Sequence, residues 1–137
     1  MRWADKIWGR TRELVDSSFY SKYELDVLQG GYCSLHYHKN RANRFIIIDA
    51  RIEIVEFYGP TYKRIVLSND QTYDVPSLVP HLFIAGKAGK LIEEYYPDRG
   101  GRVERDDIIR LTEGGISHSA DIFADIMGRM PCLKTCS

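Results

Sequence analysis

Two histidines one residue apart lie in the segment Gly31-Tyr32-Cys33-Ser34-Leu35-His36-Tyr37-His38, which is soon followed by the apolar run Arg44-Phe45-Ile46-Ile47-Ile48. Residues i and i+2 of a β-strand point to the same face, so a strand here directs both imidazoles into one space. Converging neutral imidazoles are common ligands of borderline metal ions. The segment therefore predicts a metal pocket, and the pocket needs a third ligand from elsewhere in the chain.

The only other histidines are His81 and His118. His81 directly follows Pro80 and opens a short apolar run, as expected for the first residue of a strand. His118 lies in a connection rich in Gly and Ser, where we expect a surface residue. His81 is therefore the candidate third ligand. The alternative for His36 and His38 is a pair of polar residues on a solvated strand face.

Short runs rich in β-branched and aromatic residues recur along the chain, separated by Gly, Pro, Asn or Asp. They cover residues 23–28, 32–38, 44–49, 52–57, 62–67, 72–76, 81–85 and 90–96. Strands of this length and spacing indicate an all-β sandwich or barrel. We predict a single domain over residues 1–137: a small antiparallel barrel over about 24–111, preceded by an N-terminal arm over 1–20.

The tail of the chain has a helical period. Its apolar residues occupy one face of a helix: Ile122, Phe123, Ile126, Met127 and Met130. Ser119 is a candidate N-cap, and Pro131 follows the predicted end. We expect a C-terminal helix over about 119–130 that packs on the barrel or on a partner subunit.

Composition excludes several classes of function. The 19 basic and 19 acidic side chains cancel, so nothing indicates binding to nucleic acid or an anionic membrane. No apolar run is long enough to span a membrane, and the N-terminus lacks the apolar region of a signal peptide. The cysteines are Cys33, Cys132 and Cys136, an odd number with no zinc-knuckle spacing. We expect reduced thiols in a cytoplasmic protein.

Taken together, the histidines and the predicted strands resemble the cupin superfamily. Its first motif has Gly followed by His-x-His, and its second has Pro followed by a Pro-His pair, matched here by Pro76 and Pro80-His81. The resemblance covers roughly residues 24–96. It implies a jelly-roll barrel in which His36, His38 and His81 are metal ligands.

Within that superfamily, the chain is most similar to the isomerase domain of type II phosphomannose isomerases. The matching residues are Trp8-Gly9, Ser34-Leu35, Arg41-Ala42 and Asp106-Asp107-Ile108-Ile109-Arg110. Two positions depart from that family. Asn43 stands where the family has a metal-binding Glu, and His36 stands where many members have Gln.

The resemblance implies that His36, His38 and His81 bind the metal directly, with Asn43 as a weak ligand or as a hydrogen-bond partner of a metal-bound water. Three neutral imidazoles leave the dipositive charge of a metal uncompensated, which favours an anionic ligand in the open positions. This ligand set suits Zn, Fe, Ni, Co or Mn, so the sequence predicts a divalent ion without selecting one.

Candidate substrate and catalytic residues follow from side-chain chemistry. Arg41, Arg44 and Arg110 have guanidinium groups that suit a phosphate or carboxylate, although ordinary ion-paired surface arginines are the alternative. Tyr95 is a candidate substrate contact. Glu93 and Glu94 lie on opposite faces of one predicted strand, so only one can point inward. We assign Glu94 as the candidate general base and Arg110 as its catalytic partner.

The expected function is a metal-binding cupin acting on a sugar or sugar phosphate by aldose–ketose isomerisation. One alternative is an Fe(II) dioxygenase with three histidine ligands, which the missing Glu would suit. Another is a non-catalytic module that binds a sugar or a small acid. We also expect a homodimer, with the N-terminal arm as a contact, because barrels of this kind can pair through their sheet edges.

Overall fold

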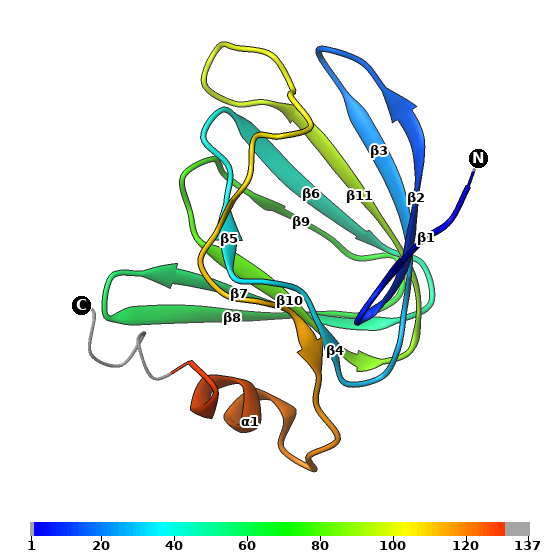
Figure 1. The fold of residues 1–137 in the computed structure, drawn as a ribbon, viewed down its shortest axis with the longest axis vertical. Helices are drawn as coiled ribbons and strands as arrows, with labels where there is room; N and C mark the ends of the chain where they lie inside the picture. Colours follow the sequence, from blue (N-terminus) through cyan, green and yellow to red (C-terminus); the bar gives the residue numbers. More distant parts are fainter. Residues whose placement is uncertain (1, 131–137) are drawn as a thin grey trace.

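The structure is a computed structural model in which residues 2–130 are described. Two β-sheets pack face to face, and one short helix lies outside them (Figure 1). Every strand pair in this part of the chain is antiparallel. The arrangement confirms the predicted jelly-roll barrel.

The first sheet has six strands in the order β1-β2-β3-β11-β6-β9. Their bounds are β1 Ala4–Lys6, β2 Gly9–Asp16, β3 Ser21–Val27, β11 Gly89–Pro97, β6 Arg41–Ile47 and β9 Thr72–Val75. The sheet combines strands from both ends of the barrel sequence, because β11 inserts between β3 and β6. That insertion places residues near position 93 beside residues near positions 23 and 45.

The second sheet is centred on β10 (His81–Lys87). On one side, β10 pairs with β7 (Arg51–Tyr58), which pairs in turn with β8 (Thr61–Leu67). On the other side it pairs with two short strands, β4 (Gly31–Tyr32) and β5 (His36–Tyr37). The short strands β13 (Gly115–Ile116) and β12 (Ile109–Arg110) complete this edge.

Strand alternation separates the core from the surface. Along β6 the inward residues Arg41, Asn43, Phe45 and Ile47 are buried. On β11, register pairs Tyr95 with Asn43 and Leu91 with Ile47, so these residues share the inner face. The interior is therefore apolar at one end, near Ile47, and polar at the other, near Arg41 and Asn43.

The turn before the His-x-His segment depends on a glycine, Gly30. Gly30 has a φ of 82°, a left-handed conformation that favours a residue without a side chain. A Cβ atom at Gly30 would also overlap the carbonyl oxygen of Ser117. Gly30 therefore sets the entry of the chain into β4 and β5.

Residues 1–20, expected as an arm, instead extend the first sheet as far as Asp16. β2 pairs with β3 from Gly9 to Asp16, and β1 folds back onto β2. At the turn between β1 and β2, the Trp8 ring lies 5.1 Å from the Phe83 ring in an edge-on arrangement. The aromatic residue thus seals one end of the barrel, whereas Phe19 is 70% exposed.

The C-terminal helix is shorter than predicted. α1 covers Ile122–Gly128, and its N-cap is Asp121, whose side chain accepts the backbone N–H of Ala124. The prediction of Ser119 as N-cap is wrong: Ser119 lies two residues before the N-cap, and its hydroxyl accepts the backbone N–H of Asp121. The packing prediction is confirmed: Ile126 is buried against the barrel core. Pro131, Cys132 and Cys136 lie outside the described residues.

No helix in residues 2–130 combines the length and the apolar character needed to cross a lipid bilayer.

If α1 is an integral part of the core, removing its buried side chain will destabilise the whole domain. Ile126 is 1% exposed, so Ile126→Ala should lower the free energy of unfolding by about 2–5 kcal/mol. Urea denaturation followed by tryptophan fluorescence measures this change. The control is Phe19→Ala at an exposed site, which should stay within about 0.5 kcal/mol of the parent. Equal effects of the two substitutions would contradict docking of α1.

Candidate metal centre

The structure brings His36, His38 and His81 together inside the barrel. His36 opens β5 and His81 opens β10, and the two residues are directly opposite in the register of these strands. His38 follows two residues after His36 on the same face, as predicted from the alternation of a strand. Their exposed fractions are 6%, 1% and 1%. The potential ligand atoms of the three side chains lie within 4.8 Å of one another.

Each imidazole has its Nδ1 next to a backbone carbonyl oxygen. The distances are 2.7 Å from His36 to Ser34, 2.7 Å from His38 to Asp107, and 2.9 Å from His81 to Val79. A carbonyl oxygen only accepts hydrogen bonds, so Nδ1 carries the proton in all three rings. Each Nε2 atom is then left with a free lone pair, which is the state in which histidine binds a metal.

Burial keeps these rings neutral. Loss of hydration lowers the pKa of His36 to about 4 and that of His38 to about 3. For His81 burial likewise lowers the pKa well below its ordinary value. The cluster is therefore a set of uncharged nitrogen donors at neutral pH.

Two further observations show that the donor set fits a cation. The Nε2 atom of His38 is buried and has no hydrogen-bond partner within the described chain, an arrangement that costs free energy unless something binds it. The Oδ1 atom of the fully buried Asn43 lies 3.3 Å from Nε2 of His81, so two lone pairs face each other. A divalent ion would satisfy both groups, with Asn43 as the predicted fourth contact.

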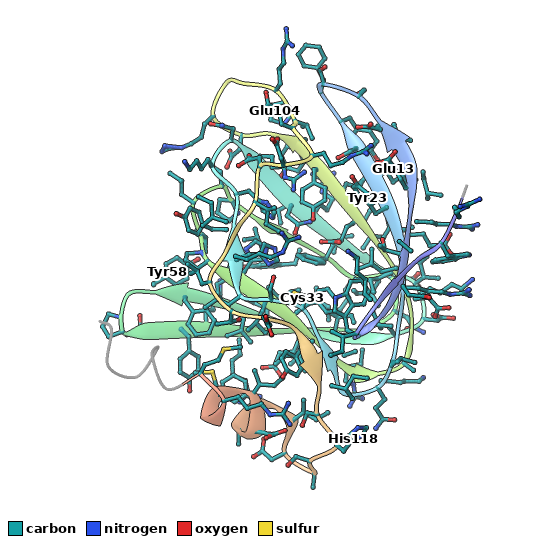
Figure 2. All side chains as sticks on the ribbon, viewed as in Figure 1. Glu13, Tyr23, Cys33, Tyr58, Glu104 and His118 are labelled. Carbon is teal, nitrogen blue, oxygen red and sulfur yellow. The ribbon has the colours of Figure 1, made fainter. Side chains whose placement is uncertain are left out.

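Next to the cluster lies a cavity of about 660 Å³ between the two sheets, with His36 in its wall. Three of the predicted site residues, Arg41, Tyr95 and Arg110, also line it. Figure 2 shows Tyr23 and Cys33, two further lining residues, on opposite sides of the barrel interior. The predicted surface residue His118 is exposed and lies in the connection leading to α1, far from this space.

Two of the predicted substrate-binding and catalytic residues, Arg44 and Glu94, do not reach the cavity. Arg44 pairs with Asp74 at 2.9 Å on the outer face of the first sheet. Glu94 also lies there, where it accepts a hydrogen bond from the Tyr20 hydroxyl and approaches Arg44 to 3.7 Å. The reason is strand parity: Asn43 and Tyr95 point inward, so the next residue of β6 and the preceding residue of β11 must point outward.

Glu93 takes the inward position that the sequence assigned to Glu94. Its carboxylate accepts a hydrogen bond from the Tyr95 hydroxyl at 3.1 Å, and burial raises its pKa. The sequence contained a signal for this placement, because Tyr95 and Glu93 are two residues apart on one strand and so share a face. Choosing Tyr95 as a substrate contact already required Glu93, rather than Glu94, as its neighbour.

Arg41 is a buried cation, 4% exposed, whose guanidinium carbon lies 3.9 Å from the centre of the Tyr95 ring. Its Nε atom is 3.3 Å from Nδ1 of His38, but that nitrogen already donates its proton to Asp107 and cannot accept another. Among the described residues, no carboxylate forms an ion pair with Arg41. Arg41 is therefore available to an anionic group in the cavity.

The lowered pKa values predict how the stability of the metal-free protein changes with pH. Unfolded histidines take up protons near pH 6.5, whereas the folded cluster resists them until about pH 4 or below. Stability should therefore be highest above pH 6.5. It should fall as the pH decreases, by about 1.4 kcal/mol per pH unit for each buried histidine.

Urea denaturation between pH 7.5 and 4.5, in the presence of a chelator, measures this slope. His38→Gln should reduce the slope by the contribution of one histidine, about 1.4 kcal/mol per pH unit. His118→Gln, at an exposed site, should leave the slope close to that of the parent protein. An unchanged slope in His38→Gln would show that this ring is not held neutral by burial.

Comparison with solved structures identifies the fold. A W96Y variant of oxalate decarboxylase from Bacillus subtilis superposes with a TM-score of 0.68 and 16% identity, covering 96% of this chain and 37% of that one. Oxalate decarboxylase from Lactobacillus farciminis superposes with a TM-score of 0.66 and 14% identity, covering 80% of this chain and 33% of that one. This chain thus spans about a third of the length of those enzymes.

A single-domain match has similar proportions to this chain. An RmlC-like cupin from Shewanella frigidimarina superposes with a TM-score of 0.60 and 17% identity, covering 72% of this chain and 86% of that one. No protein-family model and no curated protein sequence matches the chain. The identities establish architecture rather than activity, and the architecture agrees with the sheet order, the jelly-roll layers and the histidine cluster: the chain has the cupin fold.

Proposed function

We propose that the protein holds a divalent metal ion through His36, His38 and His81 and isomerises an aldose and a ketose, with a sugar or sugar phosphate as substrate. The observation that carries this proposal is the position of Glu93. It is a carboxylate in the same cavity as His36, with a pKa raised by burial and with Arg41 also in the cavity wall. A candidate general base, an anion-binding group and one of the three candidate metal ligands, His36, thus line the same cavity.

The bound ion would supply Lewis acidity toward the carbonyl and hydroxyl oxygens of an open-chain sugar. The three Nε2 atoms would hold it, and the amide oxygen of Asn43 lies close enough to contribute. Bacillus subtilis oxalate decarboxylase contains Mn(II) centres. The donors in the present protein are compatible with Mn as well as with Zn, Fe, Ni or Co.

Glu93 is suited to move the proton between adjacent carbons. It would remove the proton from C2, and the C–H electron pair would form a C1–C2 double bond. Returning this proton to C1, while the O2 hydroxyl proton passes to O1, completes the conversion of aldose to ketose. The Tyr95 hydroxyl donates to Glu93 and orients its carboxylate. Burial raises the pKa of Glu93, which strengthens it as a base.

Arg41 and Arg110 would bind the anionic end of the substrate. Arg41 is buried beside Tyr95, and Arg110 is opposite His36 in the register of β12 and β5. Two other cavity arginines are already paired, Arg12 with Glu24 and Arg105 with Glu13. Arg41 and Arg110, the cavity arginines that lie next to His38 and His36, would form charge-assisted hydrogen bonds with a phosphate or carboxylate.

Metal binding is tested by elemental analysis of the purified protein after incubation with each candidate ion. We expect about one equivalent in the parent protein and a loss of stoichiometric binding in His38→Ala, because two imidazoles cannot hold the ion as three do. His118→Ala is the matched control and should retain the parent stoichiometry. Unchanged metal content in His38→Ala would overturn the assignment of this centre.

The role of Glu93 is tested by comparing it with its outward neighbour. Glu93→Gln should lower kcat for aldose–ketose isomerisation by about 10²–10⁴-fold, the usual loss when a general base is removed. Glu94→Gln, on the outer face, should stay within a few-fold of the parent. Proton NMR in D₂O follows both the isomerisation and the entry of solvent deuterium at C1. Equal losses in the two variants would remove Glu93 from the mechanism.

A second candidate function rests on Asn43. With an amide in place of a carboxylate, the ligand set is three neutral imidazoles, which also suits an Fe(II) dioxygenase. Oxygen uptake by the Fe(II)-loaded protein with thiols or diols, without isomerisation of any sugar phosphate, would favour this alternative. Tight sugar binding that is independent of metal and gives no turnover would instead indicate a non-catalytic binding module.

A further inference from the structure

One wall of the cavity is a long segment between β11 and β13, residues 98–112, which we call the strap. In Figure 1 it runs from the loop after β11, beside β5, toward β13. It contributes Arg105, Ile108 and Arg110 to the cavity wall. Apart from the two residues of β12 it has no regular secondary structure, so contacts with the rest of the barrel must hold it in place.

Asp107 makes three of these contacts, all near His38. Its backbone oxygen accepts the Nδ1 proton of His38 at 2.7 Å. Its carboxylate accepts the backbone N–H groups of Lys39 at 2.8 Å and Asn40 at 2.9 Å. One residue of the strap therefore holds both the imidazole of His38 and the two peptide groups that follow it.

This arrangement distinguishes His38 from the other two histidines. His36 and His81 donate to Ser34 and Val79, each two residues earlier in the same segment of chain. The acceptor for His38 is 69 residues away in sequence. Two rings are thus oriented by their own local backbone, whereas His38 depends on correct placement of the strap.

We infer that Asp107 is a positioning residue that couples the metal centre to the cavity wall. The inference rests on the proposed metal site, because its effect is exerted through His38. Partners of the second ring nitrogen orient a ligating histidine, and their removal weakens metal binding. The coupling is reciprocal: a metal that fixes His38 must also stabilise the strap, and with it Ile108 and Arg110.

Other contacts define how far this coupling extends. Leu111 N–H donates to Leu35 at 2.8 Å, and the Thr112 hydroxyl accepts the Leu35 amide at 3.0 Å. These bonds join the strap to the residue immediately before His36. The strap is therefore bonded to the chain next to His36 as well as to His38 itself.

The test compares Asp107→Ala and Asp107→Asn with Asp106→Ala, a control at the adjacent exposed acid. In the metal-free protein, NMR of the histidine ring nitrogens should show three protected Nδ1–H groups. Asp107→Ala keeps the backbone oxygen that accepts from His38 but removes the carboxylate that fixes this oxygen through Lys39 and Asn40, so protection should fall at His38 alone. Asp107→Asn, whose amide oxygen can accept one of the two N–H groups, should be intermediate. Asp106→Ala should retain all three signals.

The same variants are titrated with Zn²⁺ and Mn²⁺. We expect affinity to fall by about 10–100-fold in Asp107→Ala, less in Asp107→Asn, and not at all in Asp106→Ala. In the parent protein, metal should slow hydrogen exchange at the Lys39 and Asn40 amides and along residues 103–111. Unchanged affinity and ring protection in Asp107→Ala would overturn the inference, as would equal loss at all three histidines.

The ring measurement separates this inference from the proposed function. If the parent protein binds no metal, the proposed function fails, yet selective loss of His38 protection in Asp107→Ala still establishes the positioning role. If metal binds but exchange in residues 103–111 does not change, the coupling to the cavity wall is overturned while the metal centre stands.

Discussion

Three buried imidazoles can share a pocket only if none of them is charged, and the Nδ1–H to carbonyl hydrogen bonds make this arrangement specific. Each bond gives the ring proton an acceptor, sets the tautomer and turns Nε2 toward the common centre. Burial then lowers the pKa of each ring, so protonation does not compete with a metal near neutral pH. The cost of leaving Nε2 of His38 unpartnered is the physical argument for a cation at this place.

The polar interior around the histidines follows from strand alternation on two adjacent strands. Because β6 directs Asn43 and Phe45 inward, β11 places their register partners Tyr95 and Glu93 on the same face, and Arg41 packs against the Tyr95 ring. These two strands bring a guanidinium, an amide, a carboxylate and a phenol close to the three-histidine cluster. The solved cupins share the scaffold at 14–17% identity, and a shared scaffold hosts many reactions. The proposed chemistry therefore depends on these particular side chains.

The errors at the sequence level have physical explanations. Glu93 lies two residues from Tyr95, the predicted substrate contact, so the period of a strand favours Glu93 over Glu94 as the inward carboxylate. Ser119 and Asp121 are both good N-caps, and only the backbone path shows that Asp121 reaches the Ala124 amide. For Arg44, the one feature of the sequence that indicates an outward side chain is its position next to Asn43 on the same strand. Its partner in the ion pair, Asp74, lies on a strand 30 residues away in the sequence.

The strands and the shared face of His36 and His38 are predictable from the sequence, because they depend on short-range periods and turn residues. The jelly-roll class follows from the resemblance carried by the His-x-His and Pro-His motifs. The alignment of His81 with His36, the inward carboxylate near Arg41 and the contact of Asp107 with His38 emerge in the folded chain alone. Those contacts join residues tens of positions apart, and no local period specifies the register of one strand against another. The candidate metal centre combines both levels: its three histidines are visible in the sequence, whereas the group that orients His38 is a backbone carbonyl supplied by the fold.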